Sequence, residues 1–115
     1  MPRRKLPWST IRRVALATEG VEQGTAHGLP AFRFGGKVIA AFRAEHEAMM
    51  FKVGFEAREH LMRADPRTFF ITDHYRNYPS VLARLDRVSA ADVRNLLARA
   101  IEHEGSKRKR VSSRS

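Results

Sequence analysis

The fold is decided by one stretch of the sequence, Thr68-Phe-Phe-Ile-Thr-Asp-His-Tyr-Arg-Asn-Tyr-Pro-Ser-Val-Leu-Ala-Arg-Leu85. Its first part is rich in aromatic and β-branched residues, and in its last part apolar residues recur at every second position, as is typical of strands. The connection between them, Asp73 to Pro79, holds a carboxylate, an imidazole, two phenols, a guanidinium and an amide. We therefore expect two strands joined by the loop with the densest functional groups in the chain.

Length and composition limit the class of protein. At 115 residues, of which 43% are hydrophobic, the chain fits one compact domain with one core. The absence of cysteine excludes a disulfide framework, a thiolate metal site and a cysteine nucleophile. No apolar run approaches the roughly 20 residues that cross a bilayer, and the N-terminus lacks the apolar core of a signal peptide. The sequence therefore predicts a cytoplasmic protein with no membrane partner.

The positive charge is concentrated at the two ends of the chain. The formal net charge is +10, from 22 Lys and Arg against 12 Asp and Glu. Residues 1–5 hold three basic residues and residues 106–115 hold five, with no acidic residue in either segment. The middle segment therefore has 14 basic and 12 acidic residues, a net charge of only +2. We expect one domain, residues 1–105, that is nearly neutral apart from its first five residues, followed by a disordered basic tail, residues 106–115.

Hydrophobic periodicity predicts the remaining elements. Helices are expected at about 8–18, 55–64 and 89–105, and further strands at 31–34, 37–43 and 48–53. Between the first helix and the first of these strands, residues 24–30 are expected to form a turn-rich connection. There is no alternation of strand and helix that would indicate a parallel sheet. The fold class that this order favours is α+β, with an antiparallel sheet backed by helices.

Polar residues and glycine mark the expected helix ends. Ser9 or Thr10 can cap the first helix, and Ser89 with Asp92 resembles a capping box at the start of the last one. Gly105 is expected to end that helix, because glycine readily adopts the left-handed conformation at a C-terminus.

Apolar alternation also predicts the register of the hairpin between residues 37 and 53. A four-residue loop, Ala44 to Glu47, places six apolar side chains on one face: Val38, Ala40, Phe42, Met49, Phe51 and Val53. A two-residue loop at Gly35-Gly36 would turn Phe32 and Phe34 away from this face. We therefore expect a three-residue loop, Gly35-Gly36-Lys37, with a glycine bulge that turns both phenylalanines inward.

The opposite face of the predicted sheet combines a mildly apolar centre with a basic rim. It is expected to carry Arg33, Ile39, Ala41, Arg43, Met50 and Lys52. This pattern fits a half-exposed sheet surface with ordinary long side chains, or a face that binds a partner.

Several separated blocks of the sequence resemble one family of small bacterial proteins. The blocks are His27-Gly-Leu-Pro-Ala-Phe-Arg-Phe-Gly-Gly-Lys37, Phe51-Lys52, Asp65-Pro66-x-Thr68-Phe-Phe70, His74-Tyr75-x-Asn77-Tyr78-Pro79 and Val81-Leu82-x-Arg84-Leu85. In order and spacing they are similar to the MmcQ/YjbR family over roughly residues 8–104. The resemblance implies a frataxin-like α+β fold, with similarity to double-wing DNA-binding domains, and it implies DNA binding. The basic tail lies outside the resemblance.

The sequence offers no pattern typical of catalysis or of metal binding. The five histidines share no close ligand spacing, and Glu56 with His60, four positions apart on a helix, lacks an evident third ligand. The expected first helix carries Arg12 and Arg13 where iron binding would require an acidic ridge. Ser80 has no glycine-flanked nucleophile elbow. We expect a protein that is not an enzyme, with no catalytic residue, metal or cofactor.

Binding is the function that the residues favour, and DNA is the expected partner. Arg76 could contact a phosphate and a tyrosine could stack on a base or contact a sugar. The candidate nucleic-acid contacts are Arg33, Lys37, Lys52, His74, Tyr75, Arg76, Asn77, Tyr78, Lys107, Arg108, Lys109 and Arg110.

Each part of this prediction has a structural alternative. Tyr75 and Tyr78 can instead pack the loop on the sheet, and the run Lys107 to Arg110 can simply aid solubility. The rival function is a module that binds a protein partner or a small ligand with the outer sheet face and the 73–79 loop.

Overall fold

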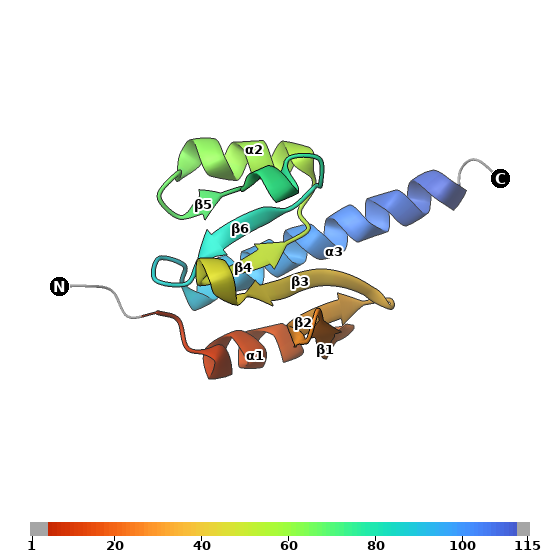
Figure 1. Cartoon of the computed structure of the whole chain (residues 1–115). Helices are drawn as coiled ribbons and strands as arrows, with labels where there is room; N and C mark the ends of the chain where they lie inside the picture. Colours follow the sequence, from red (N-terminus) through yellow and green to blue (C-terminus); the bar gives the residue numbers. More distant parts are fainter. Residues whose placement is uncertain (1–4, 113–115) are drawn as a thin grey trace.

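A computed structural model describes the backbone of residues 5–112 and the side chains of residues 5–106 (Figure 1). The elements in chain order are α1 (Trp8–Leu16), β1 (Val21–Ala26), β2 (Leu29–Phe34), β3 (Lys37–Arg43), the short 3-10 helix η1 (Ala44–His46), β4 (Ala48–Phe51), α2 (Phe55–Ala64), β5 (Phe69–Phe70), the 3-10 helix η2 (Asp73–Tyr75), β6 (Val81–Arg84) and α3 (Ala90–Ser112). The predicted α+β class is confirmed.

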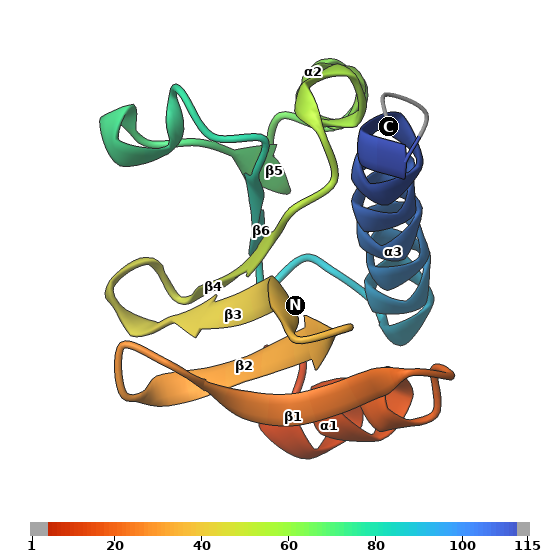
Figure 2. The ribbon, with the colours of Figure 1, turned by 90° about the vertical axis from the view of Figure 1, so that its right-hand side faces the viewer.

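All six strands form one antiparallel sheet in the order β1-β2-β3-β4-β6-β5, seen edge-on in Figure 2. β4 lies between β3 and β6, and all four of its residues are buried. A strand that is covered on both faces loses the alternation of polar and apolar residues, which explains its sequence, Ala-Met-Met-Phe. The predicted antiparallel sheet is thus confirmed.

The strand β1 replaces part of the turn-rich connection that was expected at residues 24–30. It pairs with β2 through a two-residue turn, His27-Gly28, in which both residues have positive φ, 54° and 78°. Positive φ at both positions gives the turn whose twist matches that of antiparallel strands. The sequence expectation was wrong here because β1 is an edge strand with only Val21 buried, so its residues show no apolar alternation.

The β2–β3 hairpin contains a bulge at a different place from the one expected. Phe34 pairs with Lys37, so Gly35-Gly36 is a two-residue loop and the predicted three-residue loop is wrong. The register shifts between Phe32, which pairs with Ala40, and the following pair. The shift leaves Ile39 as the extra residue on β3, and a bulge of this kind changes which side chains face the core.

This bulge keeps the expected burial of the phenylalanines but exchanges two neighbours. Phe32 is fully buried, and Phe34 packs against the same core although it is half-buried. Ile39, expected on the outer face, is fully buried in this core, and Val38, expected inside, packs against the outer-face cluster. Both expectations were wrong for one reason, since a single extra residue reverses the faces of the residues on one side of it.

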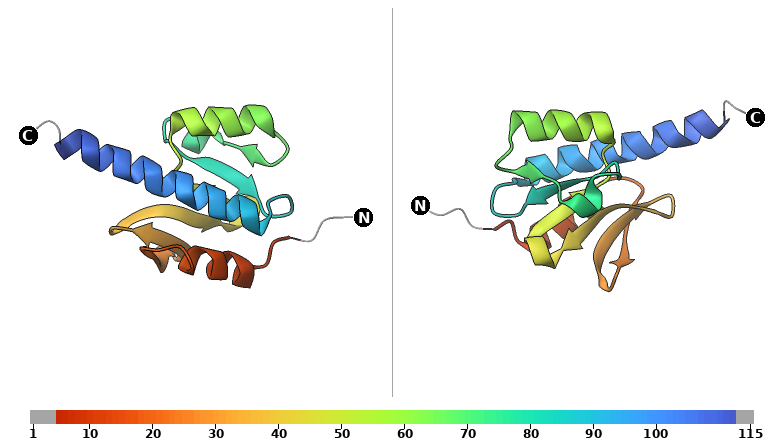
Figure 3. Two further views of the ribbon diagram at one scale, coloured as in Figure 1. Left: turned by 180° about the vertical axis from the view of Figure 1, so that it is seen from behind. Right: turned by 45° about the horizontal axis from the view of Figure 1, so that its top comes forward.

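The main core lies between the sheet and the three helices. Figure 3, left, shows α3 crossing this face with α1 on one side and α2 on the other. Ile11 and Val14 of α1 and Leu96 and Leu97 of α3 are buried in it. On α2 the expected inward residues, Ala57, Leu61 and Met62, pack against the same core. Trp8 stacks on Phe32 with their ring centroids 5.5 Å apart.

A second, smaller apolar cluster lies on the opposite face, which we call the outer face. It consists of Ala31, Ala41, Ala48, Met50, Leu82 and Tyr75. The first five come from the sheet, and Tyr75 belongs to η2 in the connection between β5 and β6. The centre of the outer face, expected to be half-exposed, is therefore buried beneath a loop.

Two of the three predicted helix ends need correction. α1 begins directly after Pro7, and neither Ser9 nor Thr10 caps it, because both already lie in its first turn. The capping box at α3 is confirmed: the Ser89 backbone N–H donates to the Asp92 carboxylate at 3.0 Å, and the Asp92 backbone N–H donates to the Ser89 hydroxyl at 3.1 Å.

Gly105 does not end the last helix, which continues to Ser112. Gly105 is not among the glycines with positive φ, so it has helical geometry. Glycine inside a helix costs only about 1 kcal/mol relative to alanine, and the Lys and Arg residues that follow are good helix formers. The predicted disordered tail, residues 106–115, lies mostly outside the residues whose side chains are described.

The turn after α2 contains the carboxylate with a shifted pKa. The side-chain hydrogen bond with Thr68, helped by the positive charge of Arg87, lowers the pKa of Asp65 below its ordinary value. Because the folded-state pKa is depressed, the stabilisation by Asp65 is present at neutral pH and is lost as the pH falls through the folded value. The Arg87 Nε also donates to the Thr68 hydroxyl at 3.2 Å, which ties this turn to the end of β6.

The bulge predicts unequal costs for two neighbouring substitutions. Ile39→Ala should lower the free energy of unfolding by about 2–5 kcal/mol, because it removes a fully buried side chain. Val38→Ala should cost clearly less, since Val38 is only half-buried. Urea unfolding of both variants measures the difference. A larger loss of unfolding free energy for Val38→Ala than for Ile39→Ala would indicate a register without the bulge.

The burial pattern of α3 predicts that its end adds little to stability. The last buried side chain described on α3 is Glu104. Deletion of residues 107–115 should therefore change the melting temperature by no more than about 2 °C in a thermal scan. A fall of more than about 5 °C would mean that this segment packs on the domain.

Candidate functional site

The 73–79 loop lies against the outer face of the sheet and is attached to it through Tyr75. The Tyr75 ring is buried in the outer-face cluster, with 6% of the residue exposed. Its hydroxyl oxygen accepts a hydrogen bond of 2.5 Å from the Arg43 Nε at the end of β3. This tyrosine therefore both covers the sheet and orients a guanidinium beside it.

Arg58 of α2 holds the same loop from its other side. Its Nη1 donates to the backbone carbonyls of Tyr75 at 3.0 Å and Tyr78 at 2.7 Å, and its Nε donates to the Glu59 carboxylate at 3.0 Å. Its guanidinium also lies over the Phe55 ring, 4.9 Å from the centroid. Only 7% of Arg58 is exposed, so its guanidinium has lost most of its hydration. The protein acceptors take the place of that water and compensate for the cost of burying the charge.

Arg58 was not among the predicted functional residues, because an arginine on an amphipathic helix usually points to solvent. A signal was nevertheless present. Arg58 precedes Leu61 by three positions and Met62 by four, which places it on the inward face of α2. A charged residue at an inward position indicates a buried guanidinium with specific acceptors.

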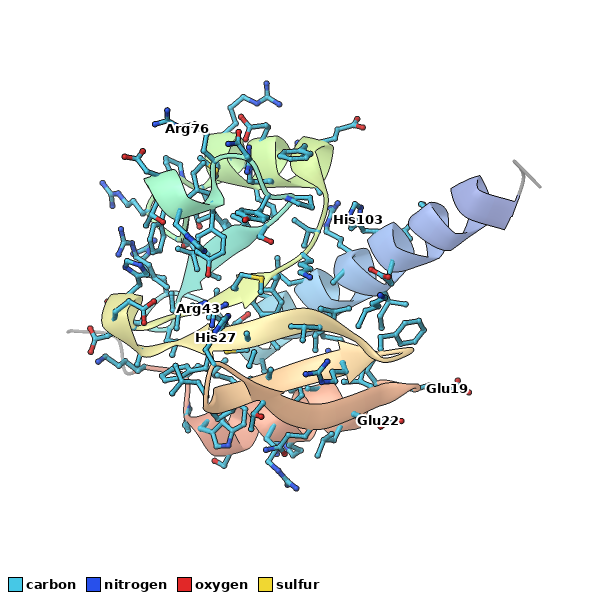
Figure 4. The ribbon with its side chains drawn as sticks, turned by 45° about the vertical axis from the view of Figure 1, so that its right-hand side comes forward. Glu19, Glu22, His27, Arg43, Arg76 and His103 are labelled. Atoms are coloured by element: carbon cyan, nitrogen blue, oxygen red, sulfur yellow. The ribbon has the colours of Figure 1, made fainter. Side chains whose placement is uncertain are left out.

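A cavity of about 430 Å³ opens on the outer face where three segments meet. The segments are the β1–β2 turn, the end of β3 with η1, and residues 72–75 of the loop region. The cavity is lined by His27, Leu29, Arg43, Glu45, His46, Thr72, His74 and Tyr75. Figure 4 shows His27 and Arg43 close together at this site. Within the described residues, no group of three or more histidines and carboxylates is close enough to hold a metal.

The exposed part of the loop presents an aromatic pair and an ion pair. His74 lies edge-on to Tyr75 and stacks on Tyr78, with ring centroids 4.8 Å and 5.7 Å apart. Tyr78 is 54% exposed. The Arg76 Nη2 lies 2.6 Å from the Asp73 carboxylate, and both side chains are exposed. Asn77 is also exposed, so four of the five predicted contact residues in the loop face solvent and Tyr75 does not.

The predicted contact residues on the strands lie elsewhere. Arg33 donates to the carbonyls of Thr25 at 3.1 Å and Gly36 at 3.3 Å, so it is tied to its own hairpins. Lys37 is exposed at the beginning of β3, whereas Arg43 and the loop lie at its end, about 20 Å away for a strand of this length. Lys52 is half-buried just after β4. The twelve predicted residues therefore do not form one patch.

A second open groove, of about 740 Å³, runs between α2 and α3. Two basic residues, Arg63 and Arg99, and two acidic residues, Glu56 and Glu102, line it, together with the 48% exposed Phe55. The groove reaches Ser106. The C-terminal part of α3 extends beyond the rest of the domain (Figure 1). The side chains of the predicted contacts Lys107 to Arg110, on the next turns of α3, lie outside the described set.

Comparison with known proteins identifies the family. A family model described as YjbR matches residues 16–102, which include the 73–79 loop and every residue that lines the outer-face cavity but not Lys107 to Arg110. No curated protein and no solved structure gives a match, so the frataxin-like and double-wing likenesses stay predictions. None of the helices in the described part of the chain is long and apolar enough to cross a membrane. The match covers most of the chain, and the protein therefore belongs to the YjbR family.

Proposed function

We propose that this protein binds DNA without catalysing a reaction on it, mainly through electrostatic contacts between the basic end of α3 and backbone phosphates. The observation that carries the proposal is the length of α3. It is 23 residues long, and it continues past its last described buried residue to Ser112. Figure 1 shows this end extending beyond the sheet.

The charge of α3 supports a phosphate-binding role for this end. Lys107-Arg108-Lys109-Arg110 are four consecutive basic residues. On a helix with a rise of about 1.5 Å per residue they occupy little more than one turn. Positive charge at this density attracts the phosphate backbone and releases condensed counterions, which favours binding independently of sequence.

The folded part of the chain adds little charge to this interaction. Residues 6–105 have a net charge of only +2. Two of the predicted arginines already have partners: Asp73 neutralises Arg76, and Arg33 donates to backbone carbonyls. Base reading also requires side chains that reach a groove. We therefore propose binding that is weakly specific or not specific for DNA sequence.

Exposed aromatic rings near the groove between α2 and the C-terminal half of α3 provide a second type of contact. Phe55 lines the groove that ends at Ser106, and Tyr78 is bound to the same part of α2 through Arg58. Bases of single-stranded DNA stack on such rings. We therefore expect these rings to contribute to the binding of single-stranded DNA and not to the binding of duplex DNA.

Removing the positive charge of the α3 end should greatly weaken binding. We expect a variant with Lys107, Arg108, Lys109 and Arg110 all changed to Gln to show a weaker salt dependence. The slope of log K for duplex DNA against log salt concentration should become less steep by up to about 3.6, at about 0.9 per lost phosphate contact. Fluorescence anisotropy at several salt concentrations measures this slope. As a matched control, Arg13→Gln with Arg94→Gln removes two exposed charges from α1 and α3 and should have little effect.

Two results would contradict the proposal. One is the absence of detectable duplex binding by the full chain at low salt, which would favour the rival partner-binding module. The other is an unchanged salt slope in the four-residue variant. If binding persists in that variant and is lost on Arg76→Ala, the folded domain contacts DNA and the α3 end does not.

A further inference from the structure

We propose that the outer-face cavity binds a small organic anion, whose carboxylate or phosphate group is held by Arg43 between the imidazoles of His27, His46 and His74. This site is separate from the DNA contacts proposed for α3. It is built from residues of the folded domain alone, all of them within the part that matches the YjbR family.

Arg43 is oriented by protein contacts that use only part of its guanidinium. Its Nε donates to the Tyr75 hydroxyl at 2.5 Å, and its Nη1 lies 3.4 Å from the Phe42 carbonyl. Within residues 5–106, its Nη2 has no protein acceptor. A planar guanidinium that is fixed in this way binds carboxylate or phosphate oxygens well, because its donors match their geometry.

Tyr75 makes this arrangement rigid. Its ring is buried in the outer-face cluster, and its backbone carbonyl accepts a hydrogen bond from Arg58. The hydroxyl that orients Arg43 is therefore held from two directions. A donor that is already oriented loses little conformational entropy when a ligand binds.

The histidines add donors around the guanidinium. Each imidazole has at least one N–H donor in either protonation state. His27 sits in the left-handed region at φ 54°, which is uncommon for a residue other than glycine, and with Gly28 it forms the turn beside Arg43 (Figure 4). His46 packs edge-on against Phe70, with ring centroids 6.1 Å apart.

One acidic residue lines the cavity, and its position is compatible with an anion. The Glu45 side chain is 61% exposed, and its carboxylate lies 4.0 Å from the His46 Nε2. Exposure to water weakens its repulsion of a bound anion. Glu45 therefore offsets little of the positive charge that Arg43 offers to an anion.

The size and the walls of the cavity favour an organic ligand over a bare inorganic ion. Its volume of about 430 Å³ lies within the range of small-molecule sites. Leu29 and the Tyr75 ring contribute apolar surface beside the polar donors. A ligand with a flat apolar body and one anionic group would use both.

The proposal can be tested by NMR titration of the full-length protein with three probes. Benzoate and phenyl phosphate carry the two anionic groups on the same ring, and benzyl alcohol is the neutral control. We expect both anions, or one of them, to shift the backbone amides of His27, Thr72 and His74 in a saturable manner. Benzyl alcohol should bind at least about tenfold more weakly than the more tightly bound anion. The stronger anion identifies the ligand group as carboxylate or phosphate.

Substitutions then test the role of Arg43. Arg43→Gln should lower the affinity for the more tightly bound anion about tenfold to a hundredfold, because a charge-assisted hydrogen bond is lost. Arg94→Gln, which removes an exposed arginine from α3, is the matched control and should leave the affinity unchanged. DNA affinity should also be the same in Arg43→Gln, because that interaction is proposed for the opposite end of the molecule.

If Arg43→Gln fails to fold, His27→Asn provides the same test from an exposed turn. Asparagine tolerates the left-handed conformation, so this variant removes the imidazole without straining the turn. We expect this variant to lower the affinity for the anion about threefold or more. The proposal is overturned if neither benzoate nor phenyl phosphate gives saturable shifts. Equal binding by wild-type protein and the Arg43 or His27 variant also overturns it.

Discussion

The guanidinium of Arg58 is the contact on which the arrangement of the outer face depends. It enters from α2 and binds the carbonyls of Tyr75 and Tyr78, so it fixes both ends of the exposed part of the 73–79 loop. With the loop in this position, Tyr75 covers the small apolar cluster of the sheet and orients Arg43. The cavity exists because these segments meet there. A buried charge is expensive unless its donors are satisfied, and here the loop carbonyls satisfy them.

The two proposed binding surfaces are separate in space and use different chemistry. In Figure 1 the basic end of α3 extends on one side of the molecule, and the β3–β4 turn beside the cavity lies on the other. The α3 end offers four consecutive basic residues, Lys107 to Arg110, and suits a repeating phosphate backbone. The cavity offers one oriented guanidinium with imidazole donors and suits a single small anion. The family match includes the second surface and not the first.

Elements with strong local patterns could be predicted from the sequence. The bounds of α2, the capping box of α3 and the burial of Phe32 follow from periodicity and polar spacing. The bulge at Ile39 could not be located, because two bulge positions place the phenylalanines equally well. β1 was missed because an edge strand needs little apolar pattern, and Gly105 was misjudged because one glycine costs too little to end a helix. Of the cavity, only His74 and Tyr75 were foreseen as site residues. The other segments that line it are brought together by strand pairing that no local pattern encodes.

The role of Arg58 is tested most directly by hydrogen exchange in Arg58→Met, with Arg63→Met on the exposed side of α2 as the control. The reporters are the backbone amides of Tyr75, Arg76 and Tyr78, which all donate to carbonyls of residues 72–75. If Arg58 holds the loop, these amides should exchange about tenfold or more faster in Arg58→Met, while the amides of β3 and β4 keep their protection. Unchanged exchange in the loop, or equal effects of the Arg58 and Arg63 substitutions, would contradict this role.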